Sequence, residues 1–127
     1  MAKYAKKRRP KYWKEPKYKY HILYKMTNKI TGHFYFGAHS TNDLRDGYAG
    51  SGVLITKAVD FHGLSNFRKE IVKYCDSRQH LYREERKLIT KDVVQNPNSY
   101  NLITGGKRKS KNTYRISRSL KNCKELL

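Results

Sequence analysis

The stretch from His21 to Gly37, HILYKMTNKITGHFYFG, constrains the fold more than any other part of the chain. Apolar side chains recur at every second position before and after its centre, which is the period of a β-strand. These alternating residues are Ile22, Tyr24 and Met26, then Phe34 and Phe36. Turn-forming residues lie between the two runs, at Thr27, Asn28, Thr31 and Gly32. The pattern predicts a β-hairpin that presents Tyr24 and Tyr35 on one small sheet.

Positive charge is concentrated at the two ends of the chain. The 127 residues carry a formal net charge of +19 and are enough for one compact domain with tails. Residues 1–20 hold nine Lys or Arg against one Glu, and residues 105–127 hold eight against one. We therefore predict a basic N-terminal arm over 1–19, a domain over 20–106 and a basic C-terminal arm over 107–127. A polyanion such as nucleic acid is the expected partner of these arms.

Composition argues against several other classes of protein. No apolar run reaches the roughly 18 residues needed to span a bilayer, and the N-terminus lacks the apolar region of a signal peptide. Cys75 and Cys123 lie far apart and form no C-x-x-C pair, which argues against a zinc site or a disulfide. We expect a soluble intracellular protein, cytoplasmic or nucleoid-associated, without a membrane partner.

The N-terminal arm mixes cations with aromatic residues, and Pro10 and Pro16 disfavour a continuous helix. Such an arm can pair with phosphates and stack on bases, or it can be a solvated basic tail. The C-terminal arm has the spacing of a short amphipathic helix from about Thr113 to Leu126. The expected nucleic-acid contacts are Lys6, Lys7, Arg8, Arg9, Lys11, Trp13, His39, Lys57, Lys107, Arg108 and Lys109.

Further elements complete an expected α+β fold, a small three-stranded antiparallel sheet flanked by helices. After a polar loop, the spacing predicts a helix over 53–61, capped by Gly50 or Ser51. Residues 66–75 alternate as a third strand, with residues 67, 69, 71, 73 and 75 on one face. A second helix is predicted from the N-cap Ser77 to about residue 89 or 90, followed by a turn over 96–99.

Glu85 occupies an unusual position in the second predicted helix. At 100° per residue, it falls at the centre of an apolar face formed by Leu81, Tyr82, Leu88 and Ile89. A carboxylate there is costly unless it is paired, protonated or bound to a metal. Ion pairing with a cation of the same helix, Arg78, Arg86 or Lys87, is the structural alternative to a functional role.

Several short motifs follow one another along residues 23–102. They are Leu23-Tyr24, Tyr35-Phe36-Gly37, Gly37-Ala38-His39-Ser40-Thr41, Asp46-Gly47-Tyr48-Ala49-Gly50-Ser51-Gly52, Gly63 followed by Asn66-Phe67, the Glu85 helix, and Ser99-Tyr100-Asn101-Leu102. Over about residues 20–106 the chain resembles the catalytic module of phage-type GIY-YIG homing endonucleases. The resemblance implies that Tyr24, Tyr35, Arg45, Glu85 and Asn101 are catalytic, with Glu85 as the ligand of Mg²⁺ or Mn²⁺.

These residue types suit phosphodiester hydrolysis, which needs a nucleophile, a neutralised phosphoryl group and a stabilised leaving oxygen. Nearby cations could lower the pKa of Tyr24 enough to make it a base or a proton relay. Arg45 could pair with the scissile phosphate, or Lys57 or Arg68 could supply the positive charge in its place. The alternative role of Asn101 is that of a turn-forming residue. His39 could assist proton transfer, contact a phosphate or simply be exposed.

The expected function is that of a magnesium-dependent DNA endonuclease. A host cell infected by a phage or another virus is one expected location. The alternative is a weakly active or inactive GIY-YIG scaffold that binds nucleic acid in a ribonucleoprotein or viral particle. Tyrosine-rich basic tails also suit structured RNA, so RNA stays open as a partner. Adhesion to anionic membrane is a third, weaker hypothesis, because no apolar anchor accompanies the charge. The sequence does not determine the oligomeric state.

Overall fold

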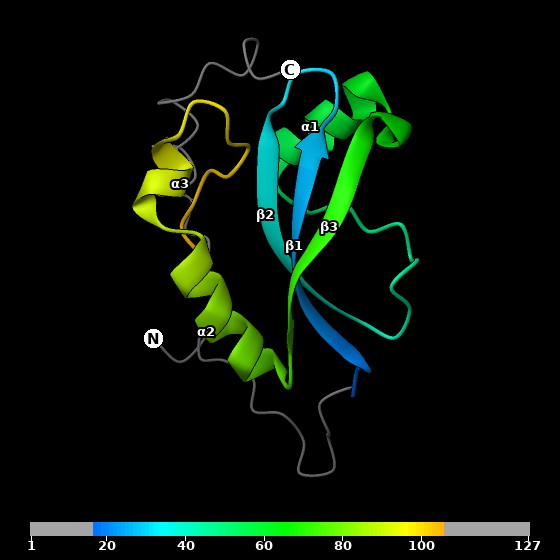
Figure 1. Ribbon diagram of the computed structural model, residues 1–127, viewed down its shortest axis with the longest axis vertical. Helices are drawn as coiled ribbons and strands as arrows, with labels where there is room; N and C mark the ends of the chain where they lie inside the picture. The colour runs from blue at the N-terminus through cyan, green and yellow to red at the C-terminus, as the bar shows by residue number, and fades with distance from the viewer. Residues whose placement is uncertain (1–16, 106–127) are drawn as a thin grey trace, which may run out of the picture.

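The computed structural model describes residues 17–105, which form a three-stranded antiparallel sheet with flanking helices. The elements in chain order are β1 (Tyr20–Asn28), β2 (Phe34–Thr41), α1 (Val53–His62), the 3₁₀ turn η2 (Leu64–Asn66), β3 (Phe67–Cys75), α2 (Arg78–Leu88) and α3 (Lys91–Gln95). β1 lies at the centre of the sheet, between β2 and β3 (Figure 1). This architecture confirms the predicted α+β class.

β1 and β2 form the predicted hairpin, with Tyr24 opposite Gly37 and Met26 opposite Tyr35. The side chain of Asn28 stabilises the turn, because its Oδ1 accepts from the N–H of Ile30 at 2.9 Å. Gly32 adopts a φ of 79°, which favours glycine. The strands are longer than the alternation predicted: β2 continues beyond Gly37 to Thr41, so the polar loop begins only at Asn42.

β3 contains a bulge that changes which side chains share a face. Tyr24 pairs with Ile71 and Leu23 pairs with Lys73, so Val72 is an extra residue on β3. Lys69 and Ile71 therefore lie on the Tyr24 face, whereas Lys73 and Cys75 lie on the opposite face. The prediction that residues 67, 69, 71, 73 and 75 share one face was wrong, because strict alternation cannot anticipate an inserted residue.

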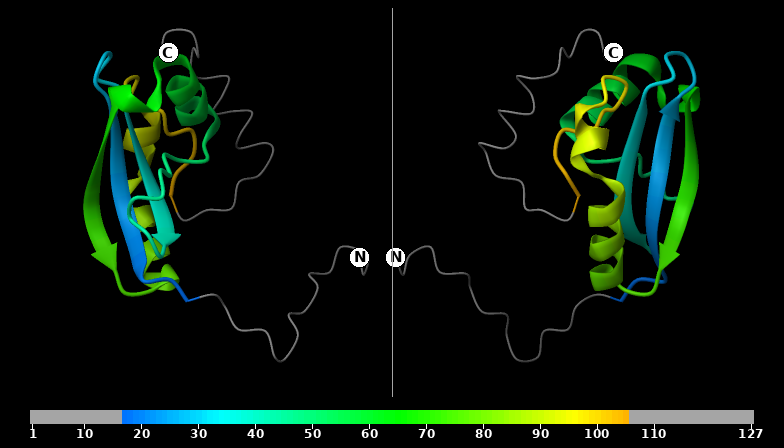
Figure 2. Two further views of the ribbon diagram at one scale, coloured as in Figure 1. Left: turned by 90° about the vertical axis from the view of Figure 1, so that its right-hand side faces the viewer. Right: turned by 60° about the vertical axis from the view of Figure 1, so that its left-hand side comes forward.

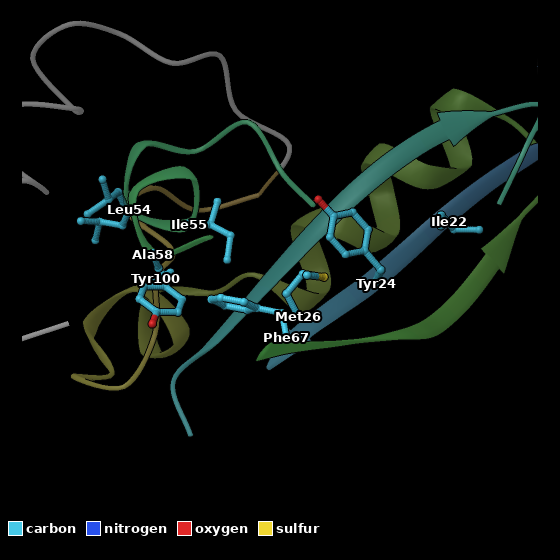
Figure 3. Close-up of a cluster of buried hydrophobic side chains, with 9 residues drawn as sticks. Ile22, Tyr24, Met26, Leu54, Ile55, Ala58, Phe67 and Tyr100 are labelled. Atoms are coloured by element: carbon cyan, nitrogen blue, oxygen red, sulfur yellow. The ribbon is translucent and has the colours of Figure 1, made fainter. Parts of the chain in front are cut away.

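The main core lies between one face of the sheet and α1. Ile22, Tyr24 and Met26 of β1 pack there with Leu54, Ile55 and Ala58 of α1, and Phe67, Tyr100 and Leu102 complete the buried cluster (Figure 3). α1 spans the predicted residues and one more. Its N-cap is Gly52 without a side-chain cap, so the expected capping by Gly50 or Ser51 was wrong.

α2 covers the opposite face of the sheet, where Leu81 packs against Leu23 and Cys75. Ser77 is the N-cap, as predicted, and its Oγ accepts from the N–H of His80 at 3.1 Å. Tyr82 is 44% exposed, so its assignment to the apolar face was wrong. α1 lies near the hairpin turn, whereas α2 begins at the other end of the sheet (Figure 2).

Residues 98–101 protect the outer edge of β2. The N–H of Phe34 donates to the carbonyl of Asn98 at 2.9 Å, and the N–H of Tyr100 donates to the carbonyl of Phe34 at 2.7 Å. Such pairing satisfies backbone groups that an edge strand otherwise exposes. The preceding short helix α3 was not predicted, since five residues carry too little periodicity to show it.

Within residues 17–105, no helix is long and apolar enough to cross a membrane. Cys75 is a free, buried cysteine. Cys123, the predicted C-terminal helix and nearly all of the two arms lie outside the described residues. The predicted arm and domain boundaries stay predictions.

Candidate active site

Tyr24 lies across the β2 strand at a point where only glycine fits. A Cβ added to Gly37, its partner on β2, would collide with the hydroxyl and ring of Tyr24. Figure 3 shows the Tyr24 hydroxyl directed toward β2. Packing therefore explains the glycine that ends Tyr35-Phe36-Gly37, because the absence of a side chain lets the phenol reach the edge of the sheet.

Tyr35 lies beside Tyr24, with the two ring centroids 6.3 Å apart. Gly50 allows the returning loop to pass close to both residues: its φ is 130°, and an added Cβ would lie 2.9 Å from Tyr35 Cε1 and 3.3 Å from the Tyr24 hydroxyl oxygen. Sequence elements far apart thus meet around two phenols. The prediction that one sheet presents both tyrosines is confirmed.

Burial is the main reason that both phenols resist ionisation. It raises the pKa of Tyr24 well above its usual value, and the neighbouring charges of Tyr35, Tyr48, Glu85 and Asp46 act in the same direction. The pKa of Tyr35 is raised to about 12, by burial and then by Tyr48 and Glu85. The expectation that nearby cations lower the pKa of Tyr24 was wrong, because burial raises it.

Glu85 of α2 is half-buried, and its charge contributes to the raised pKa of both tyrosines. The end of the described chain packs against it, since a Cβ on Gly105 would lie 2.8 Å from Glu85 Cγ. The adjacent Glu84 forms ion pairs with Lys73 at 3.2 Å and Lys87 at 3.4 Å. Lys73 and then Lys87 hold the pKa of Glu84 below its usual value. The two neighbouring carboxylates therefore have different surroundings.

Asn101 holds the strand that carries Tyr35. Its Oδ1 accepts from the N–H of Phe36 at 2.9 Å, and its Nδ2 donates to the carbonyl of the same residue at 2.8 Å. Asn101 is 4% exposed, so these bonds are shielded from water. Its side chain thus behaves like one more paired residue at the β2 edge, directly after Tyr35.

Lys69 is a cation of the site that sequence reasoning missed. Its Nζ lies 4.9 Å from the centroid of the Tyr24 ring and donates to the carbonyl of Tyr48 at 2.8 Å. Burial lowers the pKa of Lys69. Its position opposite Met26 in the strand pairing was the only available signal, and it required the exact register of β3.

His39, Asp46 and Tyr48 form a second group next to Tyr24. His39 Nε2 lies 2.7 Å from Asp46 Oδ2, and its ring stacks on Tyr48 with centroids 3.8 Å apart. The Tyr48 ring in turn meets Tyr24 edge-on, at 6.2 Å. Of these three residues, only His39 was singled out from the sequence, and Asp46 and Tyr48 are additions from the structure.

The three cations considered from the sequence as phosphate ligands, Arg45, Lys57 and Arg68, are all exposed. Arg45 is exposed in the loop between β2 and α1, where its backbone N–H donates to Asp43 Oδ1 at 2.8 Å. Lys57 is exposed on α1. Arg68 is exposed on β3 and pairs with Glu70 at 3.2 Å. The structure therefore places Tyr24 and Tyr35 side by side, with Lys69 over the Tyr24 ring and Asn101 bonded to the residue after Tyr35. Glu85 is near enough for its charge to act on both phenols, whereas these three cations lie at the surface.

Among residues 17–105 there is no group of three or more His, Cys, Asp or Glu side chains placed to hold a metal ion. A single half-buried carboxylate such as Glu85 nevertheless fits the way proteins bind Mg²⁺. That ion keeps several waters and commonly uses one or two carboxylates together with phosphate oxygens of the substrate.

Comparison with known proteins gives the chain relatives in Enterobacteria phage T4. The endonuclease segA is 41% identical over 108 residues, which are 85% of this chain. The chain is related to phage endonucleases. Two further T4 proteins, segB and segC, named as candidate endonucleases, are each 42% identical, over 68% and 70% of this chain.

These matches cover only part of each relative: 48% of segA, 39% of segB and 45% of segC. The chain therefore spans less than half the length of the curated relatives it matches. No family model matches the chain, and no solved structure matches it.

Proposed function

We propose that the chain is a magnesium-dependent DNA endonuclease of the GIY-YIG type, similar to phage homing endonucleases. The observation that carries this proposal is the pair of buried phenols, Tyr24 and Tyr35, at the place where Gly37 makes room for the Tyr24 ring. The charge of Glu85 acts on both phenols. The relation to endonucleases of a phage supports it independently. The reaction would be attack of water on a backbone phosphorus, with cleavage of a P–O bond.

In this proposal the tyrosines keep their protons until substrate binds. With pKa values raised by burial, both phenols are neutral at pH 7 and can donate hydrogen bonds to a phosphoryl oxygen or to the attacking water. Tyr24 would then act as a proton relay, passing its own proton to a phosphoryl oxygen of the substrate as it takes one from the attacking water. Asn101 would serve by positioning, since it holds the residue after Tyr35.

Glu85 would hold the Mg²⁺ ion, whose positive charge would help to neutralise the phosphate when bound. Lys69 adds a fixed positive charge on the Tyr24 face and is our preferred candidate for the cation that the family resemblance assigns to an arginine. Its amine is already partly removed from water, which strengthens its interaction with an anion.

One observation favours the second candidate, a scaffold that binds nucleic acid without cutting it. Tyr24 is only 1% exposed, so a water or phosphate must find a path to its hydroxyl before the phenol can take part in chemistry. If that path never opens, the same basic protein would bind nucleic acid without cleaving it.

Nicking of supercoiled plasmid tests these alternatives. The purified protein is incubated with plasmid in Mg²⁺ or in chelator, beside the variants Tyr24→Phe and Glu85→Gln. We expect nicking in Mg²⁺ only, reduced by about 100-fold or more in both variants, because each removes a group that acts on the transition state.

Glu84→Gln is the matched control, since it removes a carboxylate from the neighbouring position of α2 that is engaged in surface ion pairs. It should nick within about threefold of the unmodified protein. Equal plasmid binding by all four proteins without any nicking would establish the scaffold function instead. In the same assay, greater loss in Lys69→Met than in Arg45→Ala would identify Lys69 as the cation, and the reverse order would identify Arg45.

A further inference from the structure

A groove lies between the start of α2 and the neighbouring ends of β1 and β2. Its larger part has a volume of about 480 Å³ and is lined by Lys17, Tyr18, His21, Asp76, Ser77, Arg78 and Gln79. A smaller hollow of about 190 Å³ is lined by Tyr18, Ala38, His39, Ser40, Arg78, Leu81 and Tyr82. Tyr18 and Arg78 line both parts, so the two hollows adjoin.

The groove leads away from the candidate active site. His39 lines its smaller part, and the same residue stacks on Tyr48, whose ring meets that of Tyr24. Lys17 lines the larger part together with Ser77 and Arg78, at the start of α2. A ligand in the groove would therefore lie along the α2 face of the sheet, between His39 on the β2 edge and Lys17.

The chemistry of the lining suits a strand of nucleic acid. Lys17 and Arg78 supply positive charge, and Ser40 and Ser77 supply hydroxyl groups. Tyr18 adds an aromatic ring at the point where the two hollows meet, and aromatic side chains are the usual stacking partners of unpaired bases. The groove also contains the carboxylate of Asp76, which lies 3.8 Å from His80 Nδ1.

Arg78 is held in an orientation that a phosphate can use. Its Nη2 donates to the Tyr82 hydroxyl at 3.1 Å, and its guanidinium carbon lies 5.9 Å from the centroid of the Tyr82 ring. A guanidinium has five N–H donors in a rigid fork that matches the oxygens of a phosphate. Holding the fork in advance reduces the entropy lost on binding.

We propose that this groove binds one strand of DNA beside the cleavage site, with a backbone phosphate on Arg78 and a base against Tyr18. The proposal rests on the proposed nuclease function for the identity of the substrate. It adds a binding site separate from the residues that would act on the cleaved phosphate.

Binding of a short fluorescent single-stranded DNA, measured in chelator over a range of salt concentrations, tests the proposal. Arg78→Ala should weaken binding about tenfold and reduce the slope of log affinity against log salt by roughly 0.7, because one single-strand phosphate contact is lost. Tyr18→Ala should weaken binding about tenfold with little change in slope, since stacking releases no counterions.

Arg83→Ala is the matched control, because Arg83 is an exposed arginine of the same helix that lines neither hollow. It should change affinity by less than about twofold, and thermal unfolding of all variants should confirm that they remain folded. Equal effects of Arg78→Ala and Arg83→Ala, or no effect of Tyr18→Ala, would overturn the proposal. Tighter Arg78-dependent binding of the matching RNA would overturn the choice of DNA.

The binding measurement is independent of cleavage. Arg78-dependent binding by a protein that never nicks plasmid would refute the nuclease function alone. Nicking that persists with no dependence of binding on Arg78 and Tyr18 would refute the groove alone.

Discussion

At the scale of single residues, Asp46 links acid stability to the candidate active site. The hydrogen bond with His39 holds the pKa of the Asp46 carboxyl at about 2, below its usual 3.8. A lowered pKa in the folded protein stabilises it above about pH 4, and that contribution disappears as the pH falls through 2. Because Asp46 is partly exposed to solvent, we expect about 1 kcal/mol rather than the full value of the shift.

Asp46→Asn should therefore lower the free energy of unfolding by about 1 kcal/mol at pH 6, and by almost nothing at pH 2, measured with urea at each pH. Asp60→Asn, at an exposed position of α1, serves as the control and should change stability by less than about 0.5 kcal/mol. A constant difference between Asp46→Asn and the unmodified protein from pH 6 to pH 2 would contradict the assigned hydrogen bond.

Residue patterns anticipated some of the site and missed the rest for definable reasons. The helical wheel separated Glu85 from Glu84, and the structure gives the two carboxylates different surroundings. Lys69 escaped notice because its approach to Tyr24 depends on the register of β3 against β1. Such contacts arise from tertiary packing, which a local pattern does not encode.

At the scale of elements, the side chain of Asn101 fastens the segment 98–101 to the edge strand β2 by hydrogen bonds. It donates to and accepts from the backbone of Phe36, and both bonds are shielded from water. Asn101→Ala should lower the free energy of unfolding by about 2–3 kcal/mol, because two backbone groups lose their partner. Urea unfolding measures this loss directly.

The exposed Asn98 provides a control in the same segment. Asn98→Ala should cost less than about 0.5 kcal/mol, because the contact of Asn98 with Phe34 uses its backbone carbonyl, which alanine retains. Similar losses in Asn98→Ala and Asn101→Ala would contradict the fastening role. From sequence, Asn101 could be read as a turn residue or as a family site, and only the pairing at the β2 edge shows how it acts.

At the scale of the whole molecule, the three strands, α1 and α2 were predictable because each carries several periods of its own pattern. The short α3 and the pairing of residues 98–101 with β2 were not, since both depend on packing between distant segments. The strong charge asymmetry of the chain concerns arms that lie almost entirely outside the described residues. We therefore claim one active centre at the edge of β2, built by residues 17–105.

The most direct test of that claim is a double-mutant cycle on plasmid nicking, measured with protein in excess. If Tyr35 and Glu85 serve one transition state, Tyr35→Phe combined with Glu85→Gln should be about as slow as the slower single variant. Losses that multiply in the double variant would show that the two side chains act independently, which would contradict a single active centre at the edge of β2.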